Sequence, residues 1–226
     1  MSKAGYIPNQ VFVGLTWKNI RSKYEKVISK LHSSFPISFT IVGRNQNHDA
    51  DDLLEIIKDK ITSSSYAIFD ATDGNANVSL EYGFAEALDL PRALYLSDRK
   101  RGISTAMQPI ISDLAGKRRL HYKTEAKLKS LLEDFCKNHA YTKRFSNFIR
   151  SSTNRVRRGQ KRSFRTLALK LIHVLDGKQD VRREELVQEL LANNYTRDKI
   201  DSMISKLNKD GLIESPPGRY PSIKVK

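Results

Sequence analysis

Two acidic residues, Asp70 and Glu81, stand in a stretch whose residue types could support chemistry on a bound ligand. Asp70 falls at the end of an apolar, strand-like run, and the loop after it carries Asp73 and Asn75. Glu81 lies in a helix predicted to begin near Asn77, on the stripe expected to face the neighbouring sheet. A carboxylate there is costly to bury unless it is paired or its raised pKa is useful. The stretch therefore predicts a functional site.

The elements that would position these residues alternate between strands and helices. Strands are predicted at residues 10–15, 37–42, 66–71, 92–97 and 118–122, and helices at 17–31, 49–61, from 77 onward and at 124–145. Such alternation indicates a parallel sheet, and ligands bind at the carboxyl ends of its strands. The predicted fold of this N-terminal part is therefore of the α/β class, with a Rossmann-like, doubly wound, five-stranded parallel sheet.

A second domain is indicated by a change of pattern near residue 150. Six cations occur in residues 155–165, which we interpret as a linker or basic arm. Three short helices are predicted beyond it, at 164–175, 182–193 and 196–210, and then two short strands about a Pro-Pro-Gly turn. This order is typical of a winged helix. We therefore predict domains at 1–148 and 164–226, joined by a basic linker at 149–163.

The charge distribution favours a polyanionic partner for the C-terminal part, and we predict DNA. Residues 143–226 carry +11 of the net charge of +15. Candidate phosphate contacts are Arg155, Arg157, Arg158, Lys161 and Arg162 in the arm, and Arg197, Lys199, Lys206 and Arg219 on the third helix and the wing. Asp198 and Asp201 would repel phosphates from that helix, which favours the arm. The alternatives are a solvated linker and a protein-interaction or dimerisation module.

Composition excludes several other classes of protein. Cys136 is the only cysteine, which excludes an internal disulfide and fits a reducing compartment. No apolar run approaches the roughly 20 residues that span a bilayer, and the N-terminus lacks an apolar signal segment. We expect a cytoplasmic protein with no membrane partner. No metal site is predicted, because paired ligand spacing is absent from the histidines, which are His32, His48, His121, His139 and His173.

A family resemblance is carried by Asp70, Asn75, Asn77-Val78, Glu81, Gly83 and Ala85, followed by "PRALYLS". This run resembles the pattern D-x-x-x-x-N-x-N-V-x-x-E-x-G-x-A of the nucleoside 2-deoxyribosyltransferase-like and prokaryotic TIR-like superfamily. "VFVGLTW" resembles that group's first strand and substrate loop, and "ISDLAG" at 111–116 resembles a motif late in its members. The resemblance covers about residues 10–122.

The resemblance implies cleavage or transfer at the N-glycosidic bond of a nucleoside, or of a nucleotide such as NAD, which would be a substrate and not a cofactor. It implies catalytic roles for Glu81, at the sugar anomeric carbon, and for Asp70. The substrate contacts expected from it are Gly14, Leu15, Thr16, Asp73, Asn75, Asn77 and Asp113. It also implies assembly into a homo-oligomer. The alternative is a nucleotide-sensing, DNA-binding regulator that does no chemistry.

Overall fold

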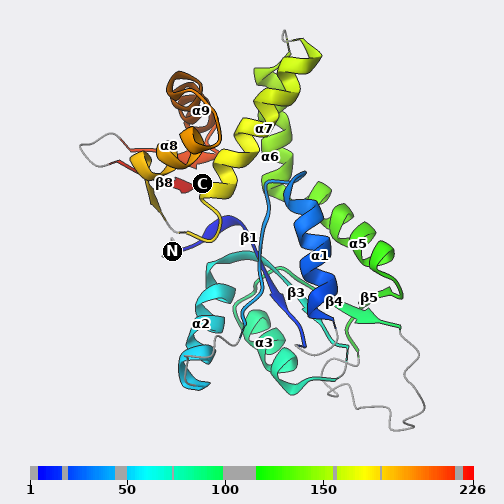
Figure 1. Cartoon of the computed structure of the whole chain (residues 1–226). Helices are drawn as coiled ribbons and strands as arrows, with labels where there is room; N and C mark the ends of the chain where they lie inside the picture. Colours follow the sequence, from blue (N-terminus) through cyan, green and yellow to red (C-terminus); the bar gives the residue numbers. More distant parts are fainter. Residues whose placement is uncertain are drawn as a thin grey trace. The chain divides into compact units, whose positions relative to one another are not determined.

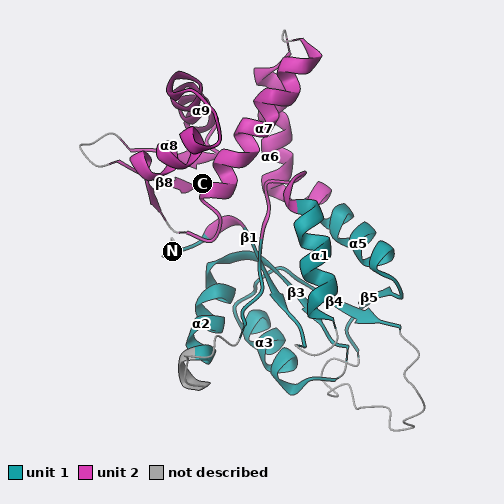
Figure 2. Cartoon of the chain, viewed as in Figure 1, with its two compact units in different colours: residues 1–6, 10–31, 39–135 teal, residues 7–9, 32–38, 136–226 magenta. Residues whose placement is uncertain are grey.

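The chain forms two compact units, coloured separately in Figure 2. The computed structural model describes residues 5–16, 20–43, 50–72, 74–98, 116–154, 157–178, 180–216 and 221–226, without the side chains of residues 50–52. Unit 1 comprises residues 1–6, 10–31 and 39–135, and unit 2 comprises residues 7–9, 32–38 and 136–226. Unit 2 thus combines the C-terminal part of the chain with two short segments from its N-terminal part.

Unit 1 is built on a five-stranded parallel sheet with strand order β2-β1-β3-β4-β5. The strands are β1 (Ile7–Gly14), β2 (Ser38–Thr40), β3 (Ser64–Asp70), β4 (Arg92–Ser97) and β5 (Arg119–Tyr122). This is a doubly wound order, in which the direction of winding reverses between β1 and β3. The prediction of an α/β fold with a five-stranded parallel sheet is confirmed.

Helices cover both faces of this sheet (Figure 1). They are α1 (Arg21–His32), α2 (Ala50–Ser63), α3 (Ala76–Ala87) and α5 (Glu125–Asn138). α1 and α5 lie on one face, and α2 and α3 lie on the other. Alternate residues of β3 serve the two faces, since Phe69 joins the α3 core with Tyr82, whereas Tyr66 packs on Phe135 of α5 at 4.8 Å between ring centroids.

Unit 2 combines helices with a three-stranded antiparallel sheet of order β6-β8-β7. Its elements are α6 (Ala140–Ser152), α7 (Arg158–Val174), β6 (Val181–Arg182), α8 (Arg183–Ala192), α9 (Arg197–Lys209), β7 (Ile213–Glu214) and β8 (Ser222–Val225). The three helices and two terminal strands predicted here are confirmed. The strand β6 was not predicted, because two residues carry no periodicity. No helix in the described ranges of the chain is long and apolar enough to cross a membrane.

Two segments differ from their predictions. The helix predicted at 124–145 is two helices, because His139 adopts an extended conformation and caps α6, its Nδ1 accepting the Tyr141 N–H at 3.2 Å. Most of the described part of the predicted linker at 149–163 is helical, since α6 continues to Ser152 and α7 begins at Arg158. Phe148 and Phe164 bring these two helices together, with ring centroids 5.7 Å apart.

Candidate active site at the carboxyl end of the sheet

Asp70 ends β3 beside the switch in winding direction, and its carboxylate is fully buried. Its Oδ2 accepts hydrogen bonds from the hydroxyls of Tyr24 (2.9 Å) and Tyr122 (2.7 Å), and its Oδ1 accepts the Thr72 N–H (2.9 Å). Burial raises the pKa of Asp70, and the hydrogen bonds from Thr72, Tyr122 and Tyr24 oppose that rise. Both carboxylate oxygens are therefore occupied by the protein itself.

Glu81 occupies the second turn of α3 and meets the end of β1. Its Oε2 is buried and has no hydrogen-bond partner among the described residues. A Cβ atom added to Gly14 would lie 2.5 Å from this oxygen, so a larger residue at position 14 would displace the carboxylate. Burial raises the pKa of Glu81 to about 7. Near neutral pH the group is thus poised between its acid and its carboxylate forms.

The two carboxylates lie on opposite faces of the sheet. Asp70 points toward Tyr24 of α1. Glu81 lies on the α3 face, beside Phe69, which comes directly before Asp70 in β3. Within the described part of unit 1 no hydrogen bond joins Asp70 to Glu81, so Asp70 does not orient Glu81 directly.

The substrate-contact residues predicted around Glu81 fall at the ends of β1 and β3. Gly14 ends β1, and Leu15 and Thr16 follow it in buried positions. Asn75, not Asn77, caps α3, because Asn75 Oδ1 accepts the Asn77 N–H at 2.8 Å and leaves Asn77 exposed in the first turn. Asp73 and Asp113 lie outside the described residues.

Three residues that support Asp70 were not predicted from sequence, namely Tyr24, Tyr122 and Thr72. Tyr24 and Tyr122 are buried, with their rings edge to face at 6.4 Å between centroids. Thr72 also accepts the Ser97 N–H through its hydroxyl at 2.8 Å, which joins the ends of β3 and β4. Their positions could have indicated this role, because Tyr24 lies at an inward-facing helical position and Tyr122 at a strand end. A buried tyrosine hydroxyl needs a hydrogen-bond partner.

The basic residues predicted to contact nucleic acid lie in unit 2, mostly at the start of α7. Arg157, Arg158 and Arg162 are exposed, and Lys161 is half-buried. Arg157 is the N-cap of α7 and makes no side-chain cap hydrogen bond in the described structure. Arg155 and Arg219 lie outside the described residues.

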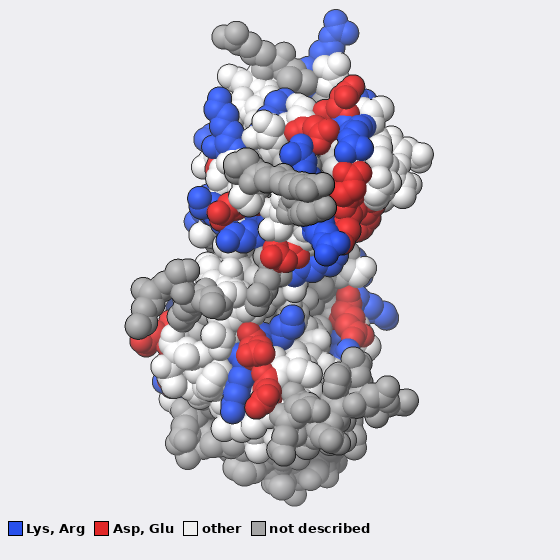
Figure 3. Space-filling model, turned by 90° about the vertical axis from the view of Figure 1, so that its left-hand side faces the viewer, with Lys and Arg blue, Asp and Glu red and all other residues white. Residues whose placement is uncertain are grey.

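The basic residues of α9 are more constrained. Arg197 pairs with Glu184 at 2.9 Å and lies 3.9 Å from Asp201, while Lys206 lies over the Phe164 ring at 5.2 Å. Lys199 is exposed. On the face shown in Figure 3, the Lys and Arg side chains of unit 2 are mixed with Asp and Glu, so no field of one sign dominates there.

A hollow of about 590 Å³ opens on unit 2 beside α6. Its lining includes Arg144, Arg150 and Asp210. Arg144 donates to the carbonyls of Gly211 and Lys226, and Arg150 donates to Asn147 Oδ1, so both guanidinium groups serve the protein. All the residues that line this hollow belong to unit 2, whereas Glu81 belongs to unit 1.

Comparison with known proteins adds a similarity to solved structures. No family model matches the chain, and no curated protein matches it. Among solved structures, the chain is similar to the CMP N-glycosidase BcmB of Clostridium botulinum, with a TM-score of 0.36 and 14% identity. The match covers 56% of this chain and 98% of that one.

Proposed function

We propose that unit 1 is an N-glycosidase-type enzyme that cleaves or transfers at the N-glycosidic bond of a nucleoside or a nucleotide such as NAD. The observation that carries the proposal is Glu81, a buried carboxyl group with an unpartnered oxygen and a pKa of about 7. It lies at the carboxyl end of the sheet, beside the switch in winding direction where doubly wound folds bind their ligands.

Glu81 suits the chemistry of this bond. When the bond between the anomeric carbon and the base nitrogen breaks, its electron pair leaves with the base and positive charge develops on the sugar. The ionised Glu81 carboxylate would stabilise that charge or form a bond to the anomeric carbon, which water or an acceptor then replaces. An oxygen that accepts no hydrogen bond from the described residues is suited to this role, and its buried position strengthens the interaction.

Asp70 contributes in a different way, as a positioning residue. Its oxygens accept from Tyr24, Tyr122 and Thr72, which come from α1, from the end of β5 and from the chain beyond β3. It thereby fixes the edge of the sheet on which the ligand would bind. The positioning role extends to Thr72, whose hydroxyl holds Ser97 at the end of β4.

The test is release of free base from NAD and from a panel of nucleosides and deoxynucleotides, followed by chromatography. We expect Glu81→Gln to lower the rate by at least about a hundredfold. Glu86→Gln is the matched control, because Glu86 lies on the same helix but pairs with Arg92 and Lys117 on its outer side. If the carboxylate is the active form, the wild-type rate falls as the pH decreases below about 7.

The competing function is a nucleotide sensor without catalysis. It predicts that wild type and Glu81→Gln bind the same nucleotide while neither releases base. Since the resemblance implies assembly, the assay is run over a range of protein concentrations, with and without DNA. Base release that survives in Glu81→Gln at every concentration would remove Glu81 from the mechanism.

We also propose that residues 164–226 form a winged helix and that unit 2 binds nucleic acid. The order α7-β6-α8-α9-β7-β8, with the sheet β6-β8-β7, supports the first part. The start of α7 supports nucleic-acid binding. Cations at a helix N-terminus are unfavourable, because they oppose the helix dipole. A phosphate bound there would accept hydrogen bonds from the N–H groups of the first turn and pair with Arg157 and Arg158.

A further inference from the structure

Three potential metal ligands from distant parts of the sequence meet within unit 2. They are His32 at the end of α1, His173 in the last turn of α7 and Asp176 in the turn that follows. Asp176 Oδ2 lies 2.7 Å from His173 Nδ1 and 3.2 Å from His32 Nε2. The two imidazole rings stack with centroids 3.6 Å apart. One carboxylate oxygen and two ring nitrogens therefore face the same point.

We propose that His32, His173 and Asp176 form a binding site for a divalent transition-metal ion, for which Zn²⁺ is the best fit. Two imidazoles and a carboxylate are a ligand set that Zn²⁺ accepts, and a water would supply the fourth position. Zn–N and Zn–O bonds of about 2.0–2.1 Å place tetrahedral ligand atoms about 3.3 Å apart. The ligand atoms here lie within 4.8 Å of one another, so small side-chain rotations suffice.

The surroundings of the cluster favour a cation. α7 ends at Val174, so its carbonyl end lies next to His173 and Asp176. Asp176 Oδ2 is the shared partner of both imidazoles, so an anionic group lies where the two ring nitrogens meet.

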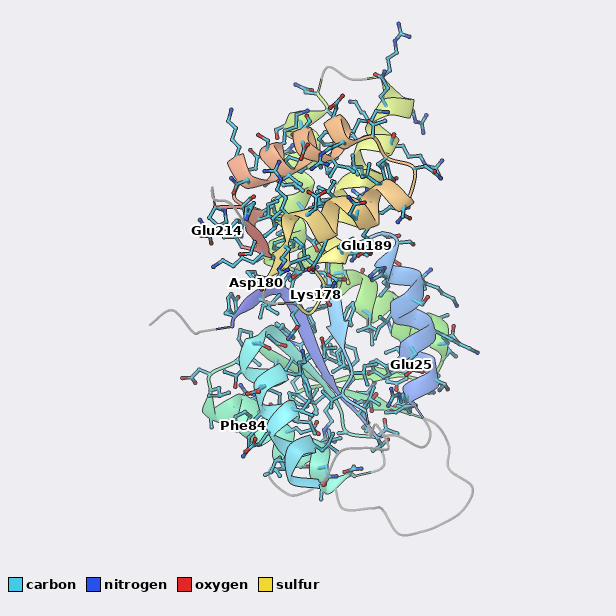
Figure 4. The ribbon with its side chains drawn as sticks, turned by 60° about the vertical axis from the view of Figure 1, so that its left-hand side comes forward. Glu25, Phe84, Lys178, Asp180, Glu189 and Glu214 are labelled. Carbon is cyan, nitrogen blue, oxygen red and sulfur yellow. The ribbon has the colours of Figure 1, made fainter. Side chains whose placement is uncertain are left out.

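A second layer of contacts holds the carboxylate. Asn9 Nδ2 donates to Asp176 Oδ1 at 3.2 Å and to the Pro36 carbonyl at 3.2 Å, which leaves Oδ2 for the ion. Gly177 adopts a φ of 68°, and this left-handed residue turns the chain just after Asp176. Lys178, labelled in Figure 4, follows on the same connection from α7 to β6.

The three proposed ligands differ in their exposure to solvent. The His32 side chain is 50% exposed, whereas those of His173 and Asp176 are 11% and 16% exposed. The buried pair is thus held in place, and His32 leaves an entrance for the ion and a position for water. The spacing of the histidines along the sequence predicted no metal site, because His173 lies 141 positions after His32 and only the fold brings them together.

The experiment is a zinc titration of the full-length, untagged chain after removal of metals, in competition with a chromophoric chelator. We expect one equivalent of bound Zn²⁺ and an affinity at least about tenfold lower in both His32→Gln and Asp176→Asn. Zn²⁺ should raise the melting temperature of the wild type but not that of His32→Gln. Co²⁺ should give the intense visible absorption of tetrahedral coordination.

The matched control is His121→Gln. His121 forms the same kind of His–Asp pair, with its Nδ1 2.7 Å from Asp98 Oδ1, but belongs to unit 1 and has no second histidine beside it in the described structure. This variant should bind Zn²⁺ like the wild type. Less than one equivalent of bound Zn²⁺, or equal affinity in His32→Gln and His121→Gln, overturns the proposal. Because His32 is half-exposed, its substitution tests the site even if Asp176→Asn fails to fold.

Discussion

Gly14 and Glu81 are matched to each other at the end of β1: the missing side chain of one makes room for the carboxylate of the other. A methyl group at position 14 would lie 2.5 Å from Glu81 Oε2 and 2.6 Å from Phe69 Cδ1. The carboxylate is thereby buried against a strand end and an aromatic ring, which provide no hydrogen bond, and its pKa rises. Glycine at this position thus allows the close packing that buries the Glu81 carboxylate.

Gly14→Ala should destabilise the protein by about 1–3 kcal/mol, because both the carboxylate and the Phe69 ring must shift. Gly83→Ala on α3 is the matched control, since nothing lies within 4 Å of its added methyl group. That change should instead stabilise the protein by up to about 1 kcal/mol through helix propensity. Urea denaturation measures both. Equal effects of the two substitutions would contradict the close approach at Gly14.

Glu81→Gln should change the pH dependence of stability. The pKa of Glu81 is raised from 4.5 to about 7, so the fold favours the protonated form, and this contribution is lost as the pH rises through that window. Glutamine mimics the protonated form at every pH. We therefore expect the variant to be more stable than wild type by up to about 3 kcal/mol above about pH 7, with no difference below about pH 4.5. Thermal unfolding across this range measures the difference, and a constant difference at all pH values would refute it.

Tyr122→Phe should destabilise unit 1 by about 1–3 kcal/mol, because it leaves the buried Asp70 carboxylate with one hydrogen bond fewer. That hydrogen bond lowers the Asp70 pKa, so its loss raises the pKa further above the ordinary value. The destabilisation should therefore be largest where Asp70 is ionised and smaller in acid. Tyr6→Phe, at a half-exposed side chain, is the control and should have little effect.

Sequence periodicity predicted the order of the strands along the chain and most of the helices. β4 matches its predicted bounds at Arg92 and Ser97, because an apolar run between a proline and a run of charged residues is a strong local signal. The break at His139 was missed, since a histidine cap interrupts the helix without interrupting the apolar stripe.

At the site, sequence identified both Asp70 and Glu81 but not the opposite faces of the sheet on which they lie. The alternation of β3 contains that signal, because Phe69 and Asp70 must face opposite sides of the sheet. What sequence could not supply is the partner of each group. Gly14 beside Glu81 and Tyr122 beside Asp70 are tertiary contacts across 67 and 52 positions.

Substitutions at the start of α7 should show whether its basic residues bind phosphates or are only exposed to solvent. If the arm contacts phosphates, Arg158→Gln and Arg162→Gln should each weaken binding to duplex DNA and lower the salt dependence of log K by about one unit. Arg197→Gln should have a smaller effect, because Arg197 already pairs with Glu184 and lies close to Asp201. Fluorescence anisotropy over a series of salt concentrations measures the slopes. A larger loss at Arg197 than at Arg158 and Arg162 would instead place the phosphates on α9, and no salt-dependent binding by the wild type would leave unit 2 with a protein partner.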